Sequence, residues 1–291
     1  MKISVVIPTY NRPEALRSCL NALLHQNGNL SYEIIVVNDG STVSYDEVIE
    51  YVKSIKSSIP IGFYSQENSG PAKARNYGVE MAQGDYIAFT DDDCAPHPNW
   101  LTSFMSHAKE DLVLGGHTIN AYRDNLYSEA SQLLVHFIYA FFKDHPSMFF
   151  TSNNLWVSRK AFKSAGGFDC THFTTSAGED RELCVRMGFL GYTLQWVGDA
   201  QINHYHAMDA ESFKGLHTKY GRSGWDFHQR VNDLGIDLGN QDNFFNYLLS
   251  YPWKQSGYTF RERCILSYLL FRSQRFGRKG YLEKGKMLKQ Q

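Results

Sequence analysis

The stretch that most constrains this chain runs from Tyr86 to Asp93. Its first four residues, Tyr86 to Phe89, are apolar or aromatic, and three consecutive carboxylates, Asp91, Asp92 and Asp93, come after Thr90. The apolar run predicts a buried strand that delivers the acids at its carboxyl end. Strand alternation would put Asp91 and Asp93 on one side and Asp92 on the other.

Three like charges at one strand end repel one another, so a folded chain tolerates them best around a cation. Carboxylate oxygens suit Mg²⁺ or Mn²⁺, which usually complete their coordination shell with water and substrate phosphates. The alternative is a solvated acidic turn that begins the next segment. The buried strand directly before the acids favours the metal site.

The chain of 291 residues is long enough for one large domain, or for a domain with an appendage. Its net charge of −1 hides an asymmetry, because residues 254–291 hold ten Lys or Arg and two acids, a charge of +8, which leaves −9 on the first 253 residues. Such a basic tail predicts a surface partner, an anionic membrane rather than nucleic acid.

The cysteine pattern and the absence of targeting segments indicate the cytoplasm. The five cysteines are scattered without a CxxC pair, which favours reduced thiols and argues against a disulfide framework or a zinc site. A strand is expected from Ile3 to Ile7, so we expect no signal peptide. No apolar run approaches the roughly 20 residues that span a bilayer. The basic tail would hold the protein peripherally at the inner face of the cell membrane if it binds lipid.

The first 41 residues predict a βαβ unit. The strand from Ile3 to Ile7 is stopped by Pro8, Asn11 is expected to cap a helix, and a second strand runs from Tyr32 to Val37 toward Asp39. This order implies a parallel sheet whose ligand lies at the carboxyl ends of the strands. Because neither GxGxxG nor GxxxxGK[ST] occurs in the expected place, the phosphates of a nucleotide must be held by a metal and by cations.

Three further stretches carry ionisable groups, each with two possible interpretations. Lys73 and Arg75 begin a helix and either bind phosphate or solvate its outer face. The pair Glu179 and Asp180 also begins a helix, and it either complements the helix dipole or supplies a base for a sugar hydroxyl. His204, which alternates with His206 near a strand end, is either a structural residue or a metal ligand.

Several motifs occur in an order that is specific when taken together. They comprise Ser4–Asn11, Glu33–Ser41, Asn68–Gly70 with Ala74–Asn76, Gly84–Asp93, Gly166–Asp169 and Gly178–Asp180. On these residues the chain resembles the family 2 glycosyltransferases, which have the GT-A fold: a Rossmann-like, mostly parallel central sheet flanked by helices. The resemblance covers residues 3 to about 206, and Tyr220-Gly221-Arg222 is typical of the segment that comes next in this family.

The resemblance implies an inverting transfer of a sugar from a nucleotide-sugar donor. Asp91 and Asp93 would match the D-x-D element that binds Mn²⁺ or Mg²⁺ on the diphosphate, with His204 next to the metal. Asp180 would match the catalytic base. Three acids stand where the pattern needs two, which leaves open how Asp91 and Asp92 divide the work. The expected substrate-binding residues are Pro8, Thr9, Tyr10, Arg12, Asp39, Lys73, Arg75, Asp91, Asp92, Asn154 and Glu179.

We expect a GT-A domain over residues 1–220, with a donor half to about residue 115 and an acceptor half from 116, and then a helical basic extension over 221–291. Within the extension, Arg261 to Phe276 predicts a helix with Ile265, Tyr268, Leu269 and Phe276 on one side. That helix either lies on an anionic membrane, which would suit a lipid-linked glycan acceptor, or packs on the domain or in a dimer.

Two alternatives to a glycosyltransferase remain at the level of sequence. A sugar nucleotidyltransferase would want a Gly-rich phosphate loop after the first strand, and Thr9 to Pro13 is not such a loop. A non-catalytic nucleotide-sugar or glycan-binding module would not need the full set of chemical positions. UDP is the expected nucleotide, and no nucleic-acid partner is expected.

Overall fold

The computed structural model describes residues 2–55, 57–173 and 177–288. The chain forms two compact units, one from residues 1–119 and 150–205 and the other from 120–149 and 206–291. The functional boundary expected near residue 220 stays a prediction, and helix α8 (Ala210–Asp233) runs through that position.

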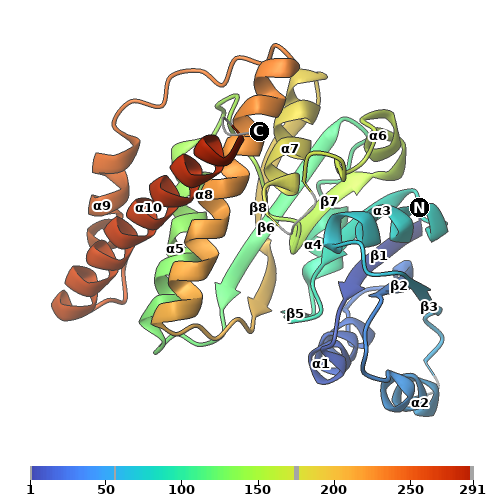
Figure 1. The fold of residues 1–291 in the computed structure, drawn as a ribbon. Coiled ribbons are helices and arrows are strands. Elements are labelled where there is room, and N and C mark those ends of the chain that lie inside the picture. Colours follow the sequence, from blue (N-terminus) through green and yellow to red (C-terminus); the bar gives the residue numbers. More distant parts are fainter. Residues whose placement is uncertain (1, 56, 174–176, 289–291) are drawn as a thin grey trace. The chain divides into compact units, whose positions relative to one another are not determined.

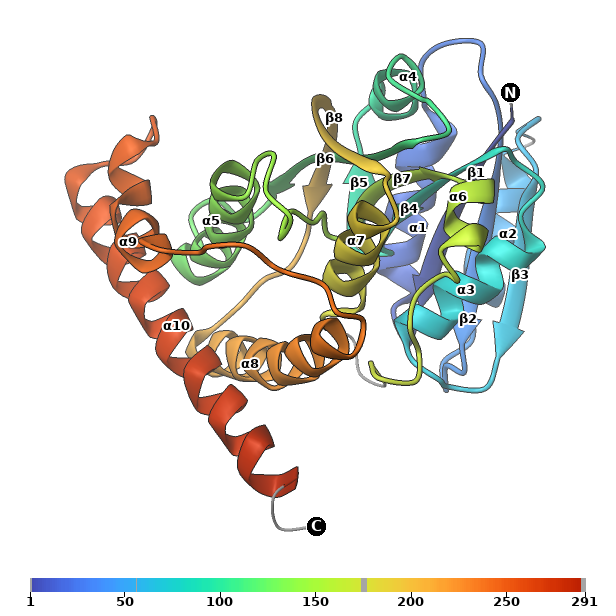
Figure 2. The same cartoon turned by 90° about the horizontal axis from the view of Figure 1, so that it is seen from above.

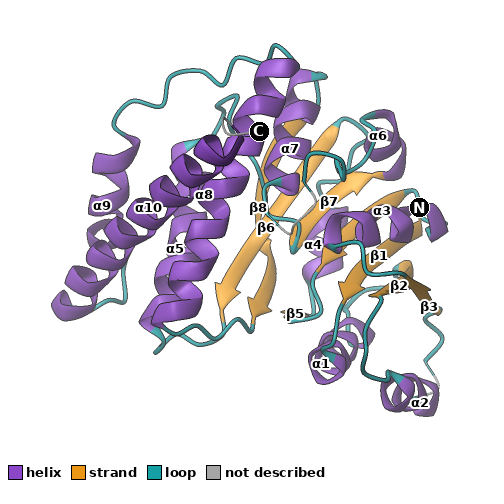
Figure 3. Cartoon of the chain, viewed as in Figure 1, coloured by secondary structure: helices purple, strands orange, loops and turns teal. Residues whose placement is uncertain are grey.

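The first unit is built on an eight-stranded sheet with the order β3-β2-β1-β4-β7-β6-β8-β5 (Figure 3). Its strands are β1 (Lys2–Thr9), β2 (Ser31–Asp39), β3 (Ile61–Gln66), β4 (Tyr86–Thr90), β5 (Cys94–Pro96), β6 (Leu112–Asn120), β7 (Asn154–Ser158) and β8 (Thr193–His204). Strands β3 and β5 were not predicted from the sequence.

The direction of the strands brings several carboxyl ends to one edge of the sheet. Strand β1 pairs in parallel with β2 and with β4, and β2 pairs in parallel with β3. Strand β7 runs antiparallel to β4 and to β6, and β5 runs antiparallel to β8. The predicted parallel βαβ arrangement is therefore confirmed for β3-β2-β1-β4, and the strands beyond β4 complete a mixed sheet.

Helices cover both faces of the parallel strands (Figure 1). One face, which carries Ile3, Val5 and Ile7, packs in one apolar cluster with the buried residues of α1 (Pro13–Leu24), α2 (Asp46–Ser54) and α4 (Trp100–Met105). Helix α3 (Pro71–Met81) covers the other face of β1 and β2. The remaining helices of this unit are α6 (Arg159–Ser164) and α7 (Glu179–Phe189).

Asn11 does not cap α1, contrary to the prediction. The N-cap residue is Arg12, while Asn11 has a left-handed φ of 55°. The side-chain oxygen of Asn11 accepts a hydrogen bond from the Thr42 amide at 2.8 Å, so it holds the loop after β2 instead. A short amide side chain serves such local turns as readily as helix caps, which is why the sequence pattern alone could not separate the two uses.

The second unit consists of α5 (Leu126–Phe141), α8, α9 (Phe244–Lys254) and α10 (Phe260–Leu288), which share one apolar core. Helix α10 crosses α8 at close range (Figure 2). A Cβ atom at Gly221 of α8 would lie 1.8 Å from the carbonyl oxygen of Gly277 in α10, so only glycine permits this approach. The ion pairs Arg222–Glu283 (2.9 Å) and Lys284–Asp226 (3.2 Å) flank the contact.

The basic tail is helical as predicted, and its apolar side packs inside this unit. Leu266, Leu269 and Leu270 are buried in the core that α10 shares with α5, α8 and α9. Tyr268 is 54% exposed, so the prediction that it shares the apolar side of the helix with Leu269 is wrong. The helix is 29 residues long, and the side that it buries is the one that carries Leu266, Leu269 and Leu270. Among the helices that the structure describes, none is both long and apolar enough to cross a membrane.

A buried histidine makes the stability of the second unit depend on pH. His217 of α8 is 2% exposed, its ring lies 4.3 Å from that of Phe213, and its Nε2 atom has no hydrogen-bond partner among the described residues. Burial lowers the pKa of His217 to about 4, from about 6.5 in an unfolded chain. The fold therefore favours neutral imidazole, so this stabilisation is complete above pH 6.5 and is lost as the pH falls toward 4.

We expect the free energy of unfolding to fall by up to roughly 3 kcal/mol between pH 7 and pH 4 through His217 alone. Urea unfolding at a series of pH values measures this. His217→Leu should flatten the pH dependence, while the same change at the exposed His25 should leave it as in the wild type. Equal pH dependence in all three proteins would contradict the assignment.

Candidate active site

The acids after β4 lie in a turn at the carboxyl edge of the parallel strands. Strand β4 ends at Thr90, so the three acids lie in a turn; Asp91 and Asp93 are partly exposed and Asp92 is not, which agrees with the expected division of sides. Asp92 is fully buried, and its Oδ2 accepts a hydrogen bond of 2.7 Å from the Thr9 hydroxyl at the end of β1. Burial raises the pKa of Asp92 to about 7, despite the opposing charge of Arg12.

Arg12 joins two of these acids at the start of α1. Its Nη2 atom lies 2.6 Å from Asp92 Oδ1, and its Nη1 atom lies 2.6 Å from Asp93 Oδ2. The other oxygen of Asp93 lies 3.5 Å from Nε2 of His204 at the end of β8. The Tyr45 hydroxyl, which the sequence did not single out, accepts from the Arg12 amide and contacts Thr9 at 2.7 Å.

Arg75 joins the third acid to the start of α7. Its Nη2 atom lies 2.6 Å from Asp91 Oδ1, and its Nη1 atom lies 3.3 Å from Glu179 Oε1. Arg75 is 3% exposed, so it does not solvate the outer face of α3 as the alternative interpretation held. The Nε atom of Arg75 and the Oε2 atom of Glu179 are buried without hydrogen-bond partners among the described residues. Buried polar atoms of this kind favour a further ligand.

The two acids that begin α7 differ in their surroundings. Gly178 caps the helix with a φ of 90°, which a side chain would oppose. Burial and the adjacent charge of Asp180 raise the pKa of Glu179. Asp180 is partly exposed, and it accepts hydrogen bonds from the amides of Ser152 (3.2 Å) and Arg181 (2.7 Å). Burial also raises the pKa of Asp180, which brings it nearer to that of an effective base.

Asp39 organises the loop that leads into α3. Its Oδ1 accepts hydrogen bonds from Gln66 (2.7 Å) and the Ser69 amide (2.9 Å), and its Oδ2 accepts one from the Gly70 amide (2.8 Å). The Asn68–Gly70 motif is thereby tied to the end of β2. Asp39 is 4% exposed and retains lone pairs that could accept from a ligand.

The remaining predicted residues are spread more widely. Pro8 is buried in β1, while Tyr10 and Lys73 are exposed. Asn154 is buried in β7, where its amide accepts from Trp100 Nε1 at 2.8 Å and donates to the Ala200 carbonyl at 3.1 Å. These contacts are those of a packing residue, so its role toward a donor stays a prediction.

Cys94 is a neighbour of the site that the sequence did not predict. Asp93, Cys94 and His204 present ligand atoms that all lie within 4.8 Å of one another. The three-residue strand β5 pairs with the end of β8 and brings Cys94 opposite His204. This strand was not predicted because three residues are too few to show an alternating pattern or an apolar run, and because Pro96 at its end argues against a strand.

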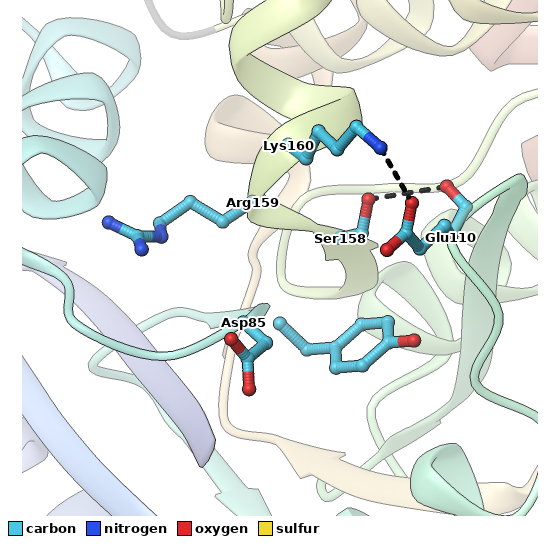
Figure 4. Close-up of a pocket in the computed structure, with 6 residues that line it drawn as sticks. Asp85, Glu110, Ser158, Arg159 and Lys160 are labelled. Atoms are coloured by element: carbon cyan, nitrogen blue, oxygen red, sulfur yellow. Dashed lines mark hydrogen bonds and ion pairs between the residues drawn. The ribbon is translucent and has the colours of Figure 1, made fainter. Parts of the chain in front are cut away.

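A separate pocket of about 230 Å³ opens at the beginning of β4 (Figure 4). It is lined by Asp85, Tyr86, Glu110, Ser158, Arg159 and Lys160. The acids lie beyond the opposite end of the same five-residue strand, roughly 17 Å away at 3.4 Å per residue. None of the predicted site residues lines this pocket, and the carboxylate edge remains the better candidate for chemistry.

Comparisons with known proteins identify the family. Residues 4–166 match glycosyl transferase family 2, and residues 86–272 match glycosyl transferase family group 2. Chondroitin synthase from Escherichia coli is 28% identical over 247 residues, which cover 72% of this chain and 35% of that protein. The chain spans between 11% and 38% of the length of eight curated relatives that it matches.

Solved structures share the fold. A mannosyltransferase from Pyrobaculum calidifontis in complex with GDP-Man and Mn²⁺ has a TM-score of 0.65 at 16% identity, covering 94% of this chain and 86% of that one. S. aureus TarS 1–349 in complex with UDP-GlcNAc has a TM-score of 0.51 at 17% identity, covering 100% and 92%. The predicted GT-A fold is confirmed. With its family model matched over more than half of its length, the chain belongs to glycosyl transferase family 2.

Proposed function

We propose that this glycosyltransferase is metal-dependent and inverting, and that it moves a sugar from a UDP-sugar to a hydroxyl of a glycan or lipid-linked glycan. The observation that carries the proposal is the meeting of two acidic groups, Asp91–Asp93 and Glu179–Asp180, through Arg75. One group suits the departing diphosphate and the other suits the attacking hydroxyl. Family membership favours this reading over a sugar nucleotidyltransferase or a non-catalytic binding module.

The residues around Asp93 fit a divalent cation. Asp93 and His204 offer an oxygen and a nitrogen 3.5 Å apart, and Asp91 adds a further carboxylate at the same turn. We propose Asp91, Asp93 and His204 as ligands of Mn²⁺ or Mg²⁺; the Mn²⁺ in the mannosyltransferase complex supports the choice of a divalent ion. Such an ion would neutralise the diphosphate and stabilise it as a leaving group.

The donor would lie along the carboxyl ends of β1 and β2. Pro8, Thr9 and Tyr10 would contact the base and ribose together with Asp39, and Asp92 would hold Thr9 and Arg12 in place. The guanidinium groups of Arg12 and Arg75, with the ammonium group of Lys73, would donate to phosphate oxygens. The UDP-GlcNAc bound by TarS supports uridine, and a thermal-shift panel of UDP-, GDP- and dTDP-sugars with Mn²⁺ tests it.

The base for the acceptor hydroxyl is the more exposed acid of the α7 pair. Glu179 is 4% exposed and committed to Arg75, whereas Asp180 is partly exposed and is held by two backbone amides. A carboxylate fixed in this way, with its pKa raised by burial, is prepared to take a proton from a sugar hydroxyl. Glu179 would contact the acceptor.

A membrane-bound acceptor would suit the exposed face of α9 and α10. Trp253 (42% exposed) and Phe260 (74% exposed) contact each other edge to face, beside the exposed Lys254 and Arg261. Exposed aromatic rings among basic side chains are typical of surfaces that bind anionic lipid headgroups. We propose that this face lies on an anionic membrane; a dimer is the competing use.

Metal binding is tested by a pair of matched substitutions just beyond the two ends of β4. Asp93→Ala should weaken Mn²⁺ binding in the presence of UDP at least about tenfold, because a hard ligand is lost. Asp85→Ala removes a carboxylate at the opposite end of β4 and should leave Mn²⁺ affinity unchanged. The signal of free Mn²⁺ in electron paramagnetic resonance measures both. Equal affinities in the two variants would show that Asp93 is not a ligand.

Catalysis is separated from binding by Asp180→Asn. Asparagine keeps the size and hydrogen bonding of aspartate but cannot accept the proton, so we expect transfer to slow by about 10²–10⁴ while UDP and Mn²⁺ affinities stay within a few-fold. Turnover and titration calorimetry on the same preparation measure this. Near-normal transfer would move the base to Glu179, and an active Glu179→Gln variant as well would remove this pair from the proposed mechanism.

Membrane binding is tested by flotation with anionic and with neutral vesicles. Phe260→Ser should weaken binding to anionic vesicles about tenfold, because one aromatic ring no longer inserts. Tyr122→Ser, which removes another exposed ring of the same unit, should have no effect. If the intact protein does not float with anionic vesicles, the membrane proposal fails; a concentration-dependent dimer weakened by Phe260→Ser would support the competing use.

A further inference from the structure

The cysteine directly after the acidic cluster lies on the proposed metal site. Strands β5 and β8 are antiparallel, and Cys94 and His204 are direct partners across the pair. Direct partners place their side chains on the same face, with Cβ atoms about 4.5–5.5 Å apart. Asp93 precedes Cys94, so three different ligand types meet where β5 begins.

The ligand atoms of these residues have the spacing of a metal site. Cys94 Sγ lies 3.8 Å from Asp93 Oδ1, and His204 Nε2 lies 3.5 Å from that same oxygen. All three atoms lie within 4.8 Å of one another. A tetrahedral ion with bonds of about 2.0–2.3 Å separates its ligand atoms by roughly 3.3–3.8 Å. Only small adjustments of these side chains are needed to form three bonds.

We propose that Cys94 is an additional protein ligand beside Asp93 and His204, which lets this site bind the thiophilic ions Zn²⁺ and Cd²⁺ in competition with Mn²⁺. The inference rests on the proposed metal site at Asp93 and His204, and adds a soft donor to it. As the sulfur–metal bond forms, the thiol gives its proton to the solvent. Mn²⁺ prefers oxygen ligands, so it would leave the thiol protonated.

The surroundings of Cys94 agree with a ligand that acts only when a soft metal binds. Cys94 is 2% exposed, so its thiol is shielded from the solvent when no metal is bound. Asp93 and His204 are partly exposed and offer a path for the ion. Among the described cysteines, Cys94 alone belongs to such a group of ligands, whereas Cys19 is fully buried in the same apolar core without belonging to such a group.

The experiment is a titration of the full chain with Cd²⁺, in which the ultraviolet charge-transfer band from thiolate to cadmium reports sulfur ligation. The wild type should show the band and release a proton for the thiol as Cd²⁺ binds. Cys94→Ser and Cys94→Ala should lose the band and bind Cd²⁺ at least about tenfold more weakly, with Mn²⁺ affinity within about threefold. Cys19→Ser, the matched control, should keep the band. Thermal unfolding verifies that each variant is folded.

The outcomes separate this inference from the proposed function. Cys94 is not a ligand if Cys94→Ser keeps the band, or if the wild type binds Cd²⁺ without showing the band. In either case the proposed metal site stands as long as Asp93→Ala weakens Mn²⁺ binding. If neither ion binds at Asp93 in the wild type, the inference and the proposed metal dependence fail together.

Discussion

The arrangement of this protein depends on five carboxylates gathered near two arginines. Asp91–Asp93, Glu179 and Asp180 come from two distant parts of the chain, and among their described cationic partners Arg12 and Arg75 make the close ion pairs. Like charges at such distances raise one another's pKa in a buried setting, so the group stays ionised only with added positive charge. In the proposed function a divalent ion and phosphate-binding cations would supply this positive charge, and transfer from a nucleotide-sugar donor would require both.

Local patterns in the sequence were sufficient for the framework of the first unit. The apolar run of β4 and the β-branched run of β1 are fully buried strands, and the parallel pairing of β1 with β2 and β4 agrees with the βαβ order. Because parallel strands end at one edge of the sheet, the contact between Thr9 and Asp92 could also have been predicted from the sequence. The predicted fold came from these features together with the family motifs.

The features that the sequence could not predict depend on contacts between distant residues. Arg12 and Asp93 are 81 positions apart, and no periodicity records that a helix cap would bridge two acids. The three acids lie in a turn after β4, so the turn sets the directions of their side chains. Strand β5 is defined by its pairing with β8, which its own three residues do not indicate. Tyr268 was assigned to the wrong side of α10 because the packing of α10 against α8 decides which side of α10 is covered.

The most direct test of the central claim is the linkage between the nucleotide and the metal. Calorimetric titration of UDP into the intact protein, at a series of Mn²⁺ concentrations and in a chelator, measures it. If the carboxylate edge holds a diphosphate through a cation, saturating Mn²⁺ should tighten UDP binding at least about tenfold, and UDP should tighten Mn²⁺ binding by the same factor. Equal UDP affinity with Mn²⁺ and with chelator would contradict the account.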